Sequence, residues 1–246
     1  MSKREPWIVG ITGASGTQYA VAVLSALAAA GESIDLIVSR SARLTILDET
    51  GISFRDGHWK ADLERLAGPL GDDLRHWTAT DFSAGPSSGS YRTRGMIVVP
   101  ATSASVAGIA LGLSKDLIQR AAEVQLKEQR KLIMVIRETP LTKSMLLRMT
   151  ELVDEGAIML AANPGFYGGP TEVQDLIDFI AGKALDLMGV EHDLLHRWDG
   201  VIGSGAAQSK ADESRVDWMV RGCELRQSMS LTNGKRARPK PVGPAS

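Results

Sequence analysis

The stretch "GMIVVPATSASVAGIALG", residues 95–112, joins a short apolar run to a segment of small and hydroxyl side chains. The run at 95–100 has the length and composition of a buried strand, and the residues from about 103 to 112 favour a helix. At this junction the chain offers a ligand little besides backbone N–H groups. Small side chains would let a flat, phosphate-bearing molecule lie against the turn and face the helix N-terminus. The stretch therefore predicts a strand–turn–helix unit with a binding corner at the end of the strand.

The same alternation of short strands and helices runs through most of the chain. Strands are expected at 7–11, 33–39, 95–100, 131–136 and 157–161. Helices are expected at 15–30, 41–47, 60–67, 103–112, 115–128, 142–155 and 171–188. Strands and helices in strict rotation predict an α/β fold, with a parallel sheet and helices on both of its faces.

Length and composition indicate one soluble domain with a tail. The chain has 246 residues, 43% of them hydrophobic, which is enough for one full core. The 28 basic and 29 acidic residues leave a net charge of −1, so no global field favours nucleic acid or a membrane surface. A single cysteine, Cys223, excludes an intrachain disulfide and a multi-cysteine metal site. With no signal-peptide pattern and no membrane-length apolar run, we expect a cytoplasmic domain at 1–200 and a partly disordered arm or tail at 201–246.

The ends of the expected strands are where a ligand should bind, because open parallel sheets bind ligands beyond their carboxyl edges. After the first strand, Gly13 and Gly16 allow a tight turn, and Ser15 is expected to open a helix whose free N–H groups favour an anion. A plain turn with a serine cap is the alternative. The glycine spacing departs from G-x-G-x-x-G, and Ser39 stands where a dinucleotide site needs an acidic residue. A mononucleotide is therefore favoured.

Hydroxyl side chains follow the second and third strands as well as the first. Ser39 follows the second strand, and Thr102, Ser103 and Ser105 follow the third. Hydroxyls at three successive strand ends favour a phosphate or flavin site over chance capping.

A charged pair, Arg137 and Glu138, directly follows the fourth expected strand. Desolvating such a pair is costly, so it either binds a ligand or forms a structural ion pair at the end of the sheet. Arg120 and Lys127, seven residues apart, are expected on one face of a helix, which an ordinary solvated face would also explain. Tyr167 lies in a Gly/Pro loop after the fifth strand, at the same edge of the sheet.

Five segments together resemble one known family. They are "GITGASGTQYA", "RAAEVQLKEQRKLIMVIRETPL", "MTELVDEGAIML", "NPGFY" and "HRWDG". In this order, over about residues 7–200, they look like the flavin prenyltransferases, the UbiX proteins formerly described as 3-octaprenyl-4-hydroxybenzoate carboxy-lyases.

The resemblance implies a Rossmann-like, three-layer flavoprotein fold with a flavin-binding domain at 1–200. It also implies a homododecamer in which neighbouring subunits share each active site. Members of the family join the dimethylallyl group of dimethylallyl phosphate to N5 and C6 of reduced FMN, without a metal. The prenylated FMN serves UbiD-type decarboxylases.

The resemblance also assigns roles to residues of this chain. The expected FMN contacts are Gly13, Ala14, Ser15, Ser39, Thr102, Ser103, Ala104, Ser105 and Arg137. The expected substrate contacts are Arg120, Lys127, Arg137, Tyr167, Lys183 and Trp198. The expected catalytic residues are Ser15, Glu49, Lys127 and Glu138.

The residue types suit the chemistry that the family carries out. Lys127 and Arg137 would stabilise the leaving phosphate as its charge grows. Trp198 would stabilise an allyl cation through its ring. Glu138, the departed phosphate or Glu49 would accept the proton lost from C6.

The chain departs from the family pattern at two places. "PATSAS" at 100–105 stands where family members usually read P-C-S-x-K-T, and Lys183 stands where arginine is usual. A lysine keeps the charge but loses a planar bidentate donor. Two alternatives therefore stay open: an FMN-binding accessory subunit of a decarboxylase, and an FMN-dependent decarboxylase of the peptidyl-cysteine type. The second usually needs an asparagine in this turn, which "PATSAS" lacks.

Overall fold

The computed structural model describes residues 4–167, 169–195 and 197, and within them six parallel strands form one sheet. The strands are β1 (Trp7–Ile11), β2 (Ile34–Val38), β3 (Leu74–Thr78), β4 (Gly95–Ala101), β5 (Leu132–Ile136) and β6 (Ile158–Ala161). Their order across the sheet is β3-β2-β1-β4-β5-β6. The chain therefore reverses its direction of winding at β1 and β4, which is where open α/β sheets bind ligands.

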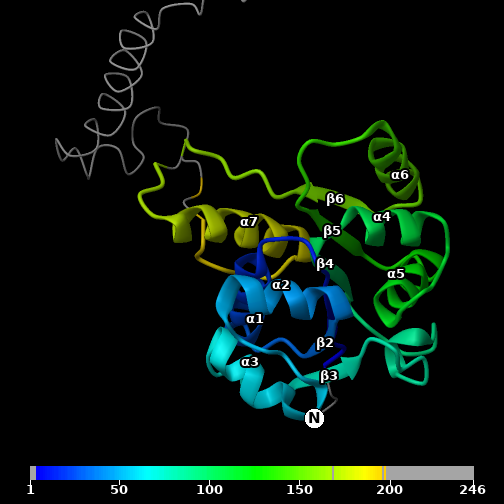
Figure 1. Ribbon diagram of the computed structural model, residues 1–246, viewed down its shortest axis with the longest axis horizontal. Coiled ribbons are helices and arrows are strands. Elements are labelled where there is room, and N and C mark those ends of the chain that lie inside the picture. Colours follow the sequence, from blue (N-terminus) through cyan, green and yellow to red (C-terminus); the bar gives the residue numbers. More distant parts are fainter. Residues whose placement is uncertain (1–3, 168, 196, 198–246) are drawn as a thin grey trace, which may run out of the picture. The chain divides into compact units, whose positions relative to one another are not determined.

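Helices cover both faces of the sheet (Figure 1). They are α1 (Thr17–Ala29), α2 (Arg40–Thr50), α3 (Trp59–Ala67), α4 (Ser103–Ala110), α5 (Leu117–Lys127), α6 (Lys143–Asp154) and α7 (Val173–Met188), with short 3₁₀ turns at Asp56–His58 and Gly85–Ser87. None of the helices in the described part of the chain is long and apolar enough to cross a membrane.

Alternate residues of the central strands face two separate cores. Val9 and Ile11 of β1 pack in the core with α1, α2, α3 and α7, whereas Ile8 packs in the core with α4, α5 and α6. Because both faces are covered, β1, β2, β4 and β5 are buried along their whole length and appear in the sequence as continuous apolar runs. The predicted α/β architecture with helices on both faces is confirmed.

Three details differ from the sequence-based expectation. Strand β3 was not expected, and it lies at an edge of the sheet, where most of its residues are only half-buried. Helix α1 begins at Thr17 instead of Ser15, after Gly16 in a left-handed conformation with φ 112°. Helix α2 continues to Thr50, three residues beyond the expected end, which places Glu49 in its last turn. The predicted tail at 201–246 lies outside the described residues.

Candidate active site

The loops that follow β1, β2 and β4 meet at the carboxyl edge of the sheet. The buried Thr12 hydroxyl donates to the carbonyl of Pro100 at 2.7 Å and accepts from the N–H of Thr102 at 2.9 Å. The N–H of Ser39 donates to the carbonyl of Ile11 at 3.0 Å. Thr12 therefore joins the two loops at the point where the winding of the sheet reverses, and the hydroxyl-bearing loops lie side by side as predicted.

Arg137 and Glu138, which follow β5, each contact a different neighbouring loop. Nε of Arg137 donates to the carbonyl of Ser15 at 3.0 Å. The Glu138 carboxylate accepts from the Ser103 hydroxyl at 3.3 Å. A cation and a carboxylate are therefore held between the loops after β1 and β4, with Arg137 half-buried and Glu138 exposed.

Glu49 binds the N-terminus of α1. Its carboxylate accepts from the N–H of Gly16 at 2.9 Å and from the N–H of Thr17 at 2.8 Å. Partial burial raises the pKa of Glu49, but hydrogen bonds from Ser15, Thr17 and Gly16 outweigh it and hold the pKa below its ordinary value. The expectation that free N–H groups beside Ser15 would receive an external anion is therefore wrong at Gly16 and Thr17, because a carboxylate of this chain already binds them.

The loop after β1 lies tightly against the start of α2. A Cβ atom at Gly13 would come within 2.6 Å of Ser41 Cβ, so only glycine allows this approach. The Thr45 hydroxyl donates to the Gly13 carbonyl at 3.1 Å. Ser39 caps α2 by accepting from the N–H of Ala42 at 3.1 Å, and its hydroxyl also lies 3.1 Å from that of Ser41. The turn at Gly13 and the hydroxyls of Ser39 and Ser41 are thus packed together at the start of α2.

The turn from Thr102 to Ser105 forms the start of α4. The Thr102 hydroxyl caps the helix by accepting from the N–H of Ser105 at 3.1 Å. Ala104 is exposed in the first turn, whereas Ala14 in the loop after β1 is buried. The first N–H groups of a helix have no partner within it, so this turn can offer N–H donors beside small side chains. Backbone contacts of this kind do not depend on which side chain stands at position 104.

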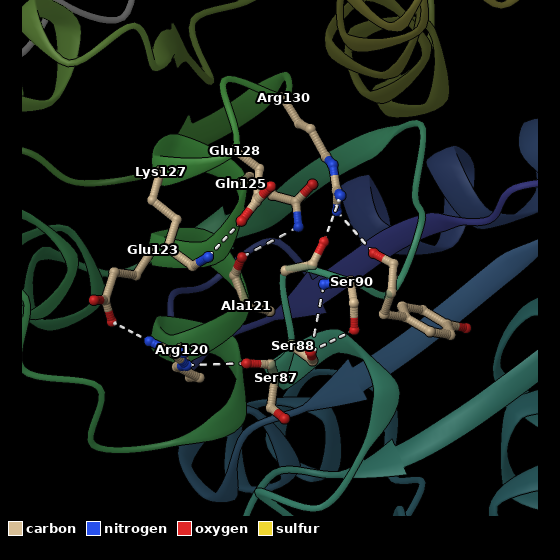
Figure 2. Close-up of polar contacts among 12 residues, drawn as sticks. Ser87, Ser88, Ser90, Arg120, Ala121, Glu123, Gln125, Lys127, Glu128 and Arg130 are labelled. Carbon is tan, nitrogen blue, oxygen red and sulfur yellow. Dashed lines mark hydrogen bonds and ion pairs between the residues drawn. The ribbon is translucent and has the colours of Figure 1, made fainter.

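Arg120 and Lys127 lie on α5, on the side that faces the segment between β3 and β4 (Figure 2). Nε of Arg120 donates to the carbonyl of Ser87 at 3.0 Å, and the Lys127 ammonium lies 2.5 Å from the Glu128 carboxylate. Helix α5 ends at Lys127, shortly before β5 begins, so this cation lies near the amino edge of the sheet. Arg137, by contrast, follows the carboxyl end of β5. One chain therefore carries its expected phosphate-binding cations in two separate places.

Tyr167 and Lys183 belong to the segment after β6. The Tyr167 ring is 66% exposed and packs edge-to-face on Phe179 of α7, with ring centroids 5.9 Å apart. Lys183 occupies an exposed position of the same helix. Trp198 lies outside the described residues.

Two polar residues of this edge were missed from the sequence. Thr12 directly follows the apolar run at 7–11, and the strand-exit rule could have found it. Ser41 gave no such signal, since its role depends on the approach of Gly13. Among the described residues, no cluster of three or more His, Cys, Asp or Glu side chains could hold a metal ion.

Comparison with known proteins gives consistent matches over the described fold. The model of the Flavoprotein family matches residues 1–185. The flavin prenyltransferase UbiX of Streptomyces coelicolor is 57% identical over 209 residues, which cover 80% of this chain and 97% of the relative.

Two solved structures extend the likeness to three dimensions. AnUbiX in complex with FMN and dimethylallyl pyrophosphate is 35% identical, with a TM-score of 0.71 over 81% of this chain and 100% of that chain. A dodecameric FMN-dependent UbiX-like decarboxylase from Escherichia coli O157:H7 is 39% identical, with a TM-score of 0.71 over 79% of this chain and 100% of that chain. The chain therefore belongs to the flavin prenyltransferase (UbiX) family of flavoproteins.

Proposed function

We propose that the chain is a flavin prenyltransferase that joins the dimethylallyl group of dimethylallyl phosphate to N5 and C6 of reduced FMN. The observation that carries this proposal is the placement of Arg137 and Glu138 between the loops after β1 and β4. A site that releases an allylic phosphate next to a flavin needs a fixed cation and a fixed carboxylate at the flavin's edge. The family relationship supports the same reaction.

The strand-exit loops fit FMN. The turn at 102–105 presents small side chains beside backbone N–H groups, and Ala104 in this turn is exposed. We assign FMN binding to the loop at 13–15, to Ser39, to the turn at 102–105 and to Arg137. When bound, reduced FMN supplies the nucleophilic N5 and C6 atoms that accept the dimethylallyl group.

The protein's own residues act on the allyl donor and on one proton. Arg137 and Lys127 bind the phosphate and stabilise the charge that it gains as the allylic C–O bond breaks. Ser15 holds Arg137 through its carbonyl, and Ser103 holds Glu138 through its hydroxyl. Glu138 accepts the proton released from C6, because its exposed carboxylate lies at the turn after β4, whereas the carboxylate of Glu49 is already bound to the N–H groups of Gly16 and Thr17.

Arg120 and Lys127 would reach this site from a neighbouring subunit. Both lie on α5, and Lys127 lies near the opposite edge of the sheet from Arg137 in its own chain. Exposed apolar side chains just after α4, just before α6 and on α6 support close subunit contacts; they are Leu111, Leu113, Leu141, Leu146, Leu147 and Val153. We propose a homododecamer, the assembly of the related E. coli protein. Its product would pass to a UbiD-like decarboxylase.

The test is anaerobic incubation of the purified protein with reduced FMN and dimethylallyl phosphate, followed by mass spectrometry of the flavin. We expect a flavin heavier by one C5 unit. A parallel incubation with dimethylallyl diphosphate identifies the donor. Bound FMN of unchanged mass with both donors would contradict the proposal and favour a flavin carrier.

A further inference from the structure

A buried aspartate forms an unusual polar cluster beneath the loop that contacts α5. Asp35 of β2 is fully buried, and burying a carboxylate is costly unless its oxygens are paired. The Tyr91 hydroxyl donates to one of its oxygens at 2.7 Å. Nε of Arg75 in β3 lies 2.9 Å from the other oxygen, and the Arg75 guanidinium lies 5.9 Å from the centre of the Tyr91 ring. Tyr91 therefore has a fixed, charged partner in the sheet.

We call residues 87–91 the serine loop, and Tyr91 is its last residue. Arg130 binds this loop by donating to the carbonyls of Tyr91 at 2.8 Å and Gly89 at 2.7 Å. The carbonyl of Ser87, in the same loop, accepts from Arg120 (Figure 2). The loop thus contacts α5 at Ser87 and the turn after α5 at Gly89 and Tyr91.

The serine loop also lies against the second cation of α5. A Cβ atom at Gly89 would come within 2.6 Å of Lys127 Nζ, so the loop backbone and the ammonium share one surface. The position of Arg120 and the space around Lys127 both depend on where this loop lies. The serine loop is held by Arg130, which binds its carbonyls, and by the Tyr91 hydroxyl, which binds Asp35.

We propose that Tyr91 is a positioning residue for the phosphate half of the active site. Its hydroxyl fixes the serine loop on Asp35, and the loop in turn holds Arg120 and bounds the space beside Lys127, in the arrangement that receives the allyl phosphate. This inference rests on the proposed function.

The hydroxyl, and not the ring, carries this role. The ring packs against Gly85, where a Cβ atom would approach Tyr91 Cδ2 to 2.7 Å. A phenylalanine would keep that packing. It would leave one oxygen of Asp35 without its donor, and an unsatisfied buried acceptor costs more than the lost bond alone. The loop can then relax away from the sheet and carry the contact to Arg120 with it.

The test uses Tyr91→Phe in the full chain, with Thr93→Val as the matched control. Thr93 lies two residues further on, and its buried hydroxyl donates to Gln125 of α5 at 2.8 Å. Both variants lose one hydroxyl that bonds a neighbouring element, but only Tyr91→Phe removes an anchor of the serine loop. We expect Tyr91→Phe to raise the KM for dimethylallyl phosphate by about tenfold, or about 1.4 kcal/mol, with little change in the Kd for FMN. Thr93→Val should lower the Tm to a similar extent and leave that KM within about twofold of the wild type.

The outcomes separate this inference from the proposed function. If Tyr91→Phe lowers the Tm but leaves the KM unchanged, the tyrosine is merely structural and the positioning role is wrong. An equal rise in KM for Thr93→Val would also overturn it, because the effect would then follow general destabilisation. If the wild type itself produces no prenylated flavin with either donor, the proposed function fails first.

Discussion

The contact between Glu49 and the N-terminus of α1 predicts a specific loss of stability when the carboxylate is replaced. In Glu49→Gln, an amide oxygen in the place of Oε2 can still accept from Thr17 at 2.8 Å and from Gly16 at 3.2 Å, but an N–H₂ group in the place of Oε1 cannot accept the 2.9 Å bond from Gly16. One charge-assisted hydrogen bond, at about 1.5–3 kcal/mol, is lost, and the favourable charge at the helix terminus adds about 0.3–1 kcal/mol. Because the second bond survives in neutral form, we expect a total loss of about 2–3 kcal/mol.

Thermal unfolding measures this loss directly. For a domain of this size, 1 kcal/mol corresponds to roughly 2–4 °C, so the Tm should fall by about 5–10 °C at neutral pH. Asp48→Asn is the matched control, because Asp48 is exposed on the same turn of α2 and its replacement removes the same charge. Protein concentration must be equal in all samples, since assembly also contributes to the Tm.

The pH dependence adds a second test of the same contact. The pKa of Glu49 is lowered in the folded state, so its contribution is fully present above the pKa of the unfolded chain and is lost as the pH falls through the folded value. The difference in Tm between wild type and Glu49→Gln should have its full size above about pH 5 and should disappear at lower pH. A Tm for Glu49→Gln no lower than that of Asp48→Asn, or a difference that persists in acid, would refute the reasoning.

Three further changes test the site and the sheet edge. Gly13→Ala should lower the free energy of unfolding by about 1–3 kcal/mol in urea, because the new methyl group meets Ser41. It should also weaken FMN binding in a fluorescence titration, and full FMN affinity would contradict the assigned loop contact. Burial lowers the pKa of His76, and Asp56 only partly opposes this, so the wild type should lose stability as the pH falls below about 6.5. For His76→Phe, the free energy of unfolding should fall less between pH 7 and pH 5 than it does for the wild type. An equal fall in both proteins, measured by urea unfolding at the two pH values, would refute that account. Glu138→Gln should reduce prenylated flavin at least about 100-fold by mass spectrometry while FMN stays bound, and an undiminished yield would exclude Glu138 as the base.

The fold was predictable wherever a strand is buried on both faces. Such strands appear as short apolar runs, and the helices between them end in recognisable glycines and caps. Strand β3 was missed because it has one neighbour in the sheet and its polar residues contact other elements: Arg75 pairs with Asp35, and the His76 ring packs against Trp59. These contacts are formed by residues far apart in the sequence, so no local sequence pattern predicts them.

The candidate site was predictable in part for a related reason. The rule that ligands bind at the carboxyl edge of a parallel sheet predicts a site at the loops after β1, β2 and β4, and the structure places these loops in contact. The partner of Glu49 was not predictable, because it depends on the extra length of α2 and on the start of α1 at Thr17. The positions of Arg120 and Lys127 could not be inferred either, since spacing along a helix says nothing about the edge of the sheet to which it points.

The separation of Lys127 from Arg137 within one chain has a consequence for when the isoprenoid donor can be cleaved. A newly synthesised subunit would carry a place for the flavin but only part of the charge needed to release phosphate. Cleavage of the donor would then begin only in the finished assembly, where an acceptor is already waiting. Under the proposed function, such an arrangement would protect the allyl donor from hydrolysis by unassembled subunits.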